Sequence, residues 1–331
     1  MNKFIKRILP ILLAIGLLVY ALKDISFRDI GQQFRQANYG WIGLAVGLSI
    51  LYYIVLGKRW QQALLALGHQ TTAFQATVAM QSGVVASMII PGSGELTRCA
   101  TIGRTDGVPL SHAVGSVVAE RVLDLIMLAL LIMLTFVFEL KRMQTYLTSL
   151  TFAKPSTLMS VLLGGVLLGG LGLYFIWRLP SVQNHSLTAK IKGFSRGLSE
   201  GFLSIRQLPS PALFIGLTVL SQVLAWMSTY FLLLSLEITQ SLPPTAALTI
   251  MAVASIGGLA VPTQGGIGTY HFFVSRAWVL YGLTLEEGVV AATFMHAVGF
   301  AIGLAFSSVS FLVVPSLVSQ RQKTTEAVRE S

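Results

Sequence analysis

Two short groups of charged side chains stand between strongly apolar stretches in the first half of the sequence. The first belongs to a Pro/Gly-rich turn, PGSGELTR, in which Glu95 and Arg98 are three residues apart. The second is the run ERVLD, which contains Glu120, Arg121 and Asp124. Charges inside or beside a bilayer are costly and are kept mainly where something uses them. Both groups are therefore candidates for a functional site.

The chemistry that these groups suit is the binding of a phosphate. A Gly-rich turn that opens a helix, here with Gly92 and Gly94, exposes backbone N–H groups that can bind an anion. One helical turn beyond Gly94, the guanidinium of Arg98 has the forked geometry that suits phosphate. With Glu95 and the second charged group, these residues predict a site for a zwitterionic or anionic phospholipid headgroup. The alternative is that the charges only neutralise one another inside the protein.

A second Pro/Gly break occurs in the other half of the sequence, within VPTQGGIGTYHFFVSR. Gly265, Gly266 and Gly268 allow close approach to the backbone, and His271 follows them. These residues are the second half of the predicted headgroup site. Close packing between helices is the alternative for the glycines. For His271, as for His296 further along, the alternative is a hydrogen-bonded packing role.

Membrane helices must position these residues. Of 331 residues, 54% are hydrophobic and only 11% are charged, and the mean hydropathy of +0.73 is far above that of an ordinary soluble domain. The net charge of +10 comes mainly from basic loops, which set membrane orientation and do not indicate nucleic-acid binding. The single cysteine, Cys99, can form neither an internal disulfide nor a cysteine-based metal site. The fold class predicted is an all-α, polytopic membrane bundle.

Six apolar stretches are predicted to be membrane spans. They cover residues 8–22, 41–56, 113–138, 157–177, 212–236 and 289–314. No cleavage site follows the first, which is expected to remain as an anchor. The basic pair Lys58 and Arg59 is expected to end the second. Residues 25–38 and 178–211 have the pattern of amphipathic helices at the membrane surface.

The order of these elements repeats. In each half, residues 1–140 and 155–315, two spans precede a short apolar segment (74–90 or 246–261), a Pro/Gly break and a long span. If the short segments are re-entrant and both termini are cytoplasmic, each half crosses three times and the halves are inverted repeats. Seven or eight spans result if one or both short segments cross fully. The six-span count places residues 23–35 outside, and their basic residues argue against it. Residues 316–331 are expected to be a polar, disordered cytoplasmic tail.

The motifs of enzymes that hydrolyse their substrates are missing from the sequence. It has no HExxH, no Walker-type loop and no GxSxG. We therefore predict no catalytic residues, no metal and no cofactor.

Three motifs together resemble the membrane region of the lysylphosphatidylglycerol synthase family, also called the flippase-like domain family. They are PGxGExxR at 91–98, ERxxD at 120–124 and PxxGGIG at 262–268. The resemblance implies an inner-membrane protein with a lipid-translocating fold over residues 1–315, whose charged groups contact a lipid headgroup. In the full-length synthases this region is joined to a soluble aminoacyl-transferase domain, whereas the resemblance here covers the membrane part only, so aminoacylation of lipid by this chain alone is not expected. His271 stands where many members have an acid, and Gln264 replaces a frequent proline, so the headgroup and any proton coupling stay open.

The leading hypothesis is a phospholipid flippase or transporter whose partner is the membrane phospholipid itself. One alternative is a membrane-embedded transferase that acts on a lipid-linked substrate, with Glu95 or Glu120 as a base. Another is a non-transporting partner of a separate lipid-modifying or envelope-assembly enzyme.

Overall fold

All the regular structure in the described part of the chain is helical. The computed structural model describes residues 15–16, 18–20, 27–90, 92–149, 208 and 210–330. Four of the described helices are long and apolar enough to cross a membrane: α3 (Tyr39–Ala66), α6 (Leu110–Ser149), α10 (Pro211–Leu234) and α13 (Leu285–Glu330). The predicted all-α class is confirmed. The span at 157–177 and most of the segments at 8–22 and 178–211 lie outside the described residues.

The first Pro/Gly break lies inside a helical hairpin formed by α4 (Ala73–Ile89) and α5 (Gly94–Asp106). The two ends of this hairpin lie side by side, because Nε2 of His69, before α4, is 2.8 Å from Nδ1 of His112, after α5. The chain therefore enters and leaves the hairpin at the same end of the bundle.

The second break lies inside a corresponding hairpin. α11 (Pro244–Ala260) leads through the short helix η2 (Gln264–Gly266) into α12 (Thr269–Ala277) and η3 (Trp278–Tyr281). The Tyr281 hydroxyl lies 2.6 Å from the hydroxyl of Thr249 in the first half of α11. This hairpin also returns to the end at which it began.

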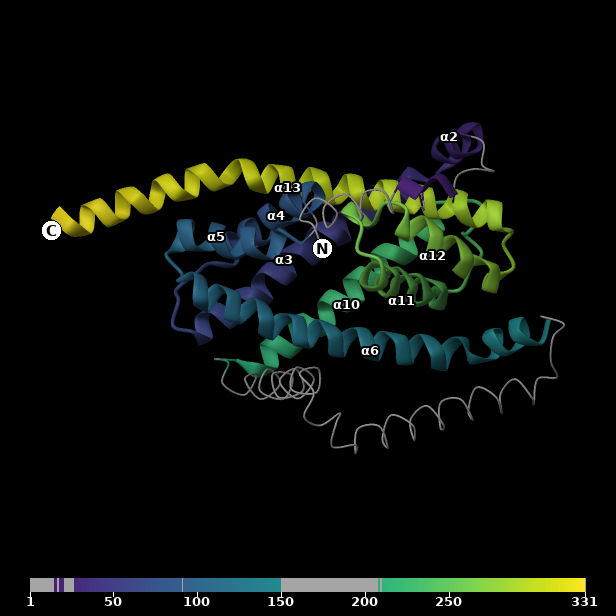
Figure 1. Ribbon diagram of the computed structural model, residues 1–331, viewed down its shortest axis with the longest axis horizontal. Coiled ribbons are helices and arrows are strands. Elements are labelled where there is room, and N and C mark those ends of the chain that lie inside the picture. Colours follow the sequence, from purple (N-terminus) through teal and green to yellow (C-terminus); the bar gives the residue numbers. More distant parts are fainter. Residues whose placement is uncertain are drawn as a thin grey trace, which may run out of the picture.

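The long helices enclose the two hairpins. α13 runs along one side of the molecule and α6 along the opposite side, while α3 and α10 pass between them (Figure 1). α4 packs against α13, α11 packs against α6, and α3 packs against α10. One apolar core lies around Trp60 and Ile102 among α3, α4, α5 and α6. The other lies around Trp278 and Phe294, mainly among α10 to α13.

The amphipathic helix predicted after the first span is present as α2 (Phe27–Gln36). It ends just before Asn38, whose side-chain oxygen accepts hydrogen bonds from the backbone N–H groups of Gly40 and Trp41 at 3.0 and 3.4 Å. Asn38 thereby caps the start of α3.

Three helices extend further than predicted. α3 does not end at Lys58 and Arg59 but continues to Ala66, and α6 continues past Phe138 to Ser149. The expectation of a disordered tail at 316–331 is wrong, because α13 remains helical to Glu330. In each case a polar stretch lies at the expected end of the helix, but polar residues can continue a helix beyond the bilayer or pair within the protein.

A contact with another helix helps to explain why the end of α13 is ordered. Nη1 of Arg321 donates hydrogen bonds to the carbonyl oxygens of Gly103 and Arg104, at 2.7 and 3.1 Å. These carbonyls belong to the last turn of α5, and that of Gly103 also accepts the N–H of Gly107 at 3.1 Å. Arg321 therefore joins the end of α13 to the end of α5.

Candidate functional site

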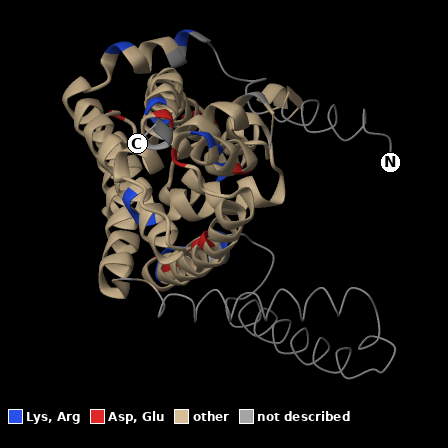
Figure 2. Ribbon diagram, turned by 90° about the vertical axis from the view of Figure 1, so that its left-hand side faces the viewer, with Lys and Arg blue, Asp and Glu red and all other residues tan. Residues whose placement is uncertain are grey.

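Six charged side chains form one ion-pair network where α3, α5 and α6 meet. They are three arginines and three carboxylates, namely Arg59, Arg98, Arg121, Glu95, Glu120 and Asp124. Most of the ribbon in Figure 2 carries no charge, and blue and red segments lie next to one another inside the bundle. The two charged groups singled out in the sequence are thus brought together, and Arg59 joins them.

One half of the network is buried. The side chain of Glu120 is 1% exposed, and its two oxygens lie 3.3 Å from Arg59 and 3.0 Å from Arg98. Arg59 also reaches Asp124 at 3.0 Å, and the Arg98 guanidinium lies over the ring of Trp60, 4.9 Å from its centre. This half fits the alternative in which the charges only neutralise one another inside the protein, because each buried charge has a partner of opposite charge.

The other half of the network is open. The side chains of Arg121 and Glu95 are 52% and 44% exposed, and the distance between them is 3.4 Å. Arg121 is also 3.4 Å from Asp124. An exposed arginine well inside an apolar helix has to face water or lipid headgroups, because acyl chains cannot solvate it. Arg121 and Glu95 can therefore exchange their partner for a ligand.

Arg98 connects the two halves. Its Nε lies 2.8 Å from Glu95 and its Nη1 3.0 Å from Glu120. Its Nη2 is buried, and it has no hydrogen-bond partner within the described ranges. An unpaired guanidinium donor is costly to bury. An anionic oxygen would satisfy it.

Arg59 was not predicted as part of the site. The pair Lys58 and Arg59 follows an apolar run and has the pattern of a membrane-span end. The signal that could have identified Arg59 is the sequence after it, in which Trp60 and the run 63–67 continue an apolar helical pattern. A charge inside such a pattern is more typical of a buried pair than of a loop.

The first break brings α4 and α5 into close contact. A Cβ atom on Gly94 would lie 2.5 Å from the carbonyl oxygen of Gly83 and 2.1 Å from the Ser87 hydroxyl. The N–H of Gly94 donates to Ser87 Oγ at 3.1 Å, so this N–H group is engaged within the protein. Gly92 has φ +79°, which a residue with a side chain rarely adopts. The first break therefore depends on glycine both for its turn and for its packing.

The second break is held by a histidine. Gly265, Gly266 and Gly268 have φ values of +59°, +76° and +80°. Nε2 of His296, on α13, lies 2.8 Å from the carbonyl oxygen of Gly265. His271 is buried next to His296, and the centres of the two rings are 4.8 Å apart. Of the two histidines, His296 is the one that contacts the break.

The two breaks line one cavity of about 510 Å³. On the side of α4, α5 and α6 it is lined by Ser87, Gly92, Gly94, Glu95, Arg98 and Arg121. On the side of α11 and η2 it is lined by Gly258, Pro262, Thr263, Gly265 and Gly266. The predicted site residues Glu120, Asp124, Gly268 and His271 lie outside this lining. Glu120 and Asp124 instead form ion pairs with the arginines of the network.

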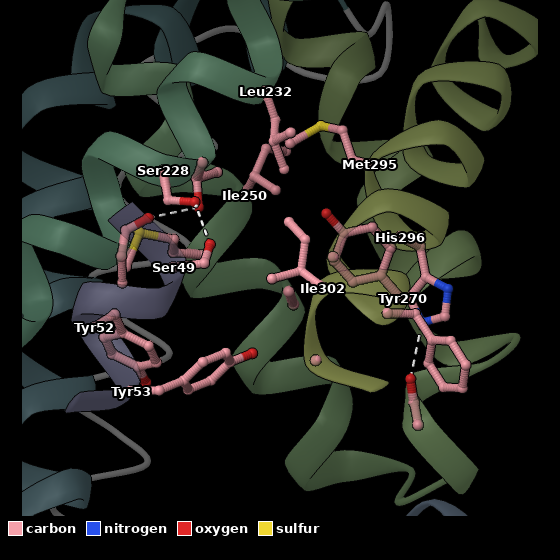
Figure 3. Close-up of a pocket in the computed structure, with 18 of the residues that line it drawn as sticks. Ser49, Tyr52, Tyr53, Ser228, Leu232, Ile250, Tyr270, Met295, His296 and Ile302 are labelled. Atoms are coloured by element: carbon pink, nitrogen blue, oxygen red, sulfur yellow. Dashed lines mark hydrogen bonds between the residues drawn. The ribbon is translucent and has the colours of Figure 1, made fainter. Parts of the chain in front are cut away.

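A second cavity, of about 440 Å³, adjoins the first. It lies among α3, α10, α11 and α13, with Ser49, Ser228, Tyr270 and His296 among its polar lining (Figure 3). His296, which the sequence did not assign to the site, is thus a cavity residue.

The apolar spanning helices and the charged cavity define the class of protein, an integral membrane protein built as a helical bundle. The sequence matches the family model "Lysylphosphatidylglycerol synthase TM region" over residues 7–307. The chain therefore belongs to the family of lysylphosphatidylglycerol synthase transmembrane regions, a membrane domain associated with lipid handling. Comparison with curated proteins and with solved structures gives no match.

Proposed function

We propose that this protein moves phospholipids across the membrane. The polar headgroup passes through the cavity between the two breaks, while the acyl chains remain in the bilayer. The observation that carries this proposal is that both breaks line a single cavity, which contains the exposed arginine and carboxylate of the network. The lipid handling associated with the family supports it.

Each part of a headgroup has a complementary group in this cavity. Arg121 and the unpaired Nη2 of Arg98 suit the phosphodiester oxygens. Glu95, released from Arg121, suits an ammonium or hydroxyl donor on the same headgroup. Gly92 and Gly266 present no side chain to obstruct its passage.

The geometry favours transport over the alternative of a lipid transferase. Both oxygens of Glu120 are paired with arginines, and its side chain is almost completely buried. Glu95 is paired with Arg98 and Arg121. A general base has to reach the proton that it removes, and the buried Glu120 is not free to do so.

We also propose that the two halves are inverted repeats. The N–H of Asn38, at the start of α3, donates to the carbonyl of Ser235, at the end of α10, at 2.8 Å. The Arg142 guanidinium, near the end of α6, lies 4.4 Å from the ring centre of Tyr281, just before α13. Because Arg321 of α13 contacts the end of α5, beside the start of α6, α13 runs opposite to its counterpart α6, as α10 runs opposite to α3. Such repeats are a common plan of secondary transporters.

Labelling of single cysteines tests this topology. With both termini in the cytoplasm of an inner-membrane protein, His69→Cys at the first hairpin end is expected to face the cytoplasm and Glu286→Cys at the second the outside. A membrane-impermeant maleimide should label position 286 in intact spheroplasts and position 69 only after lysis. The parent protein should stay unlabelled, because Cys99 is buried. Labelling of both positions from one side would refute the inversion.

Reconstitution tests the transport function. Purified protein in vesicles should move acyl-labelled phospholipid between the leaflets at a rate well above that of protein-free vesicles. Size-exclusion chromatography of the same preparation establishes that the protein is folded. If folded protein gives no more transfer than empty vesicles, the proposal is wrong.

A further inference from the structure

His296 is the ionisable group of the second cavity whose ordinary titration range lies nearest neutral pH. The described residues that line this cavity include Tyr52, Tyr53 and Tyr270, which titrate far above neutrality, but no Asp, Glu, Lys or Arg. An imidazole titrates close to neutral pH. The charge of this cavity therefore depends on one side chain.

The hydrogen bond at the second break fixes the form of the neutral ring. A carbonyl oxygen only accepts hydrogen bonds, so Nε2 of His296 must carry the proton that is donated to Gly265. Nδ1 is then the nitrogen that gains or loses a proton as the pH changes. Protonation of His296 adds a positive charge to the cavity and leaves the contact with Gly265 in place.

The elements around His296 bring no acidic group to balance such a charge. α12 contributes Tyr270 and His271, whose ring centres lie 5.2 and 4.8 Å from that of His296. α3 contributes Tyr52 and Tyr53, and η2 contributes a backbone carbonyl. The described residues of α4, α10 and α11 in the lining are not ionisable, and α2, α5 and η3 contribute none to it. An imidazolium in this apolar space would attract an anion strongly.

The second cavity adjoins the first. Both are lined by Tyr52, Tyr53, Val84, Met88 and Gly265. The second cavity is therefore the neighbouring space for a phosphate that leaves the arginines of the first.

We infer that His296 is a second binding station for the lipid phosphodiester, occupied when its imidazole is protonated. This role rests on the proposed function, because the phosphate reaches His296 by way of Arg98 and Arg121. Transfer of an anionic lipid then accelerates as the pH falls, since only the protonated ring attracts phosphate.

The pH profile of transport tests this inference. The wild type, His296→Gln and His112→Gln are reconstituted in vesicles with acyl-labelled phosphatidylglycerol, and transfer is followed by albumin back-extraction at equal pH on both sides. As the pH is lowered from about 8 to the most acidic value at which the vesicles stay sealed, wild-type transfer should rise roughly tenfold, the effect of one charge-assisted contact. Glutamine can still donate to Gly265 but does not titrate, so His296→Gln should remain active with a flat profile. His112→Gln, altered outside the cavity, should keep the wild-type profile.

Three results would overturn the inference. A flat profile in the wild type would do so without any variant, and so would an unchanged rise in His296→Gln. A flat profile in His112→Gln would assign the titration to the histidine pair at the hairpin end. If the wild type moves no lipid at any pH, the transport function itself is wrong, whereas pH-independent transport would leave that function standing.

Discussion

Replacing Glu120 with alanine is expected to destabilise the protein by about 3–5 kcal/mol, the usual cost of removing one partner from a buried ion pair. The substitution leaves Arg59 and Arg98, with side chains only 3% and 4% exposed, without the carboxylate that both contact. The measurement is thermal unfolding of purified protein in detergent, together with the yield of monodisperse protein.

The matched control for this prediction is Glu95→Ala. Glu95 belongs to the same network, but its side chain is 44% exposed, and exposed pairs contribute at most about 1 kcal/mol. Its loss should leave the unfolding temperature close to that of the wild type. Equal stability of Glu120→Ala and the wild type would show that the buried half of the network is not needed for folding.

Replacing Arg121 with alanine is expected to lower phospholipid transport by roughly tenfold or more, because it removes a charge-assisted contact to the phosphate. Stability should change little, since the side chain is 52% exposed and its ion pairs are long, at 3.4 Å. The transfer rate in vesicles and the unfolding temperature of the same preparation separate these two effects.

Arg104→Ala serves as the control for Arg121. Arg104 is also an exposed arginine of the first half, but it does not line the cavity between the breaks. Its replacement should leave transport near the wild-type rate. Equal losses in the two variants would indicate a general effect of surface charge on reconstitution and would count against a phosphate contact at Arg121.

The residue types of the candidate site are easier to predict from the sequence than their arrangement in space. Charges and glycines inside apolar stretches are unusual enough to be recognised one by one, and this singled out Arg98, Arg121 and Gly265, which line the cavity between the breaks. Which histidine contacts the second break depends on the rotation of α12 and α13 about their axes. His271 is next to the break in the sequence, whereas His296 reaches it from a different helix.

The residues at which the helices end are the least predictable feature, because they also depend on contacts between distant parts of the chain. A basic pair in an apolar helix can mark the membrane surface or be neutralised by carboxylates far away in the sequence. Arg59 is neutralised by Glu120 and Asp124, and Arg321 is held by carbonyls of α5. Both contacts join distant parts of the chain, which local periodicity does not show.

Chemical blocking of the cavity from the second break tests the central claim most directly. Thr263 lines the cavity opposite Arg98, and Cys99, the native cysteine, is buried. Thr263→Cys is expected to transport phospholipid until a bulky thiosulfonate reagent modifies it, and to recover when a reductant removes the adduct. Full modification with no change in the transfer rate would contradict a headgroup path between the two breaks.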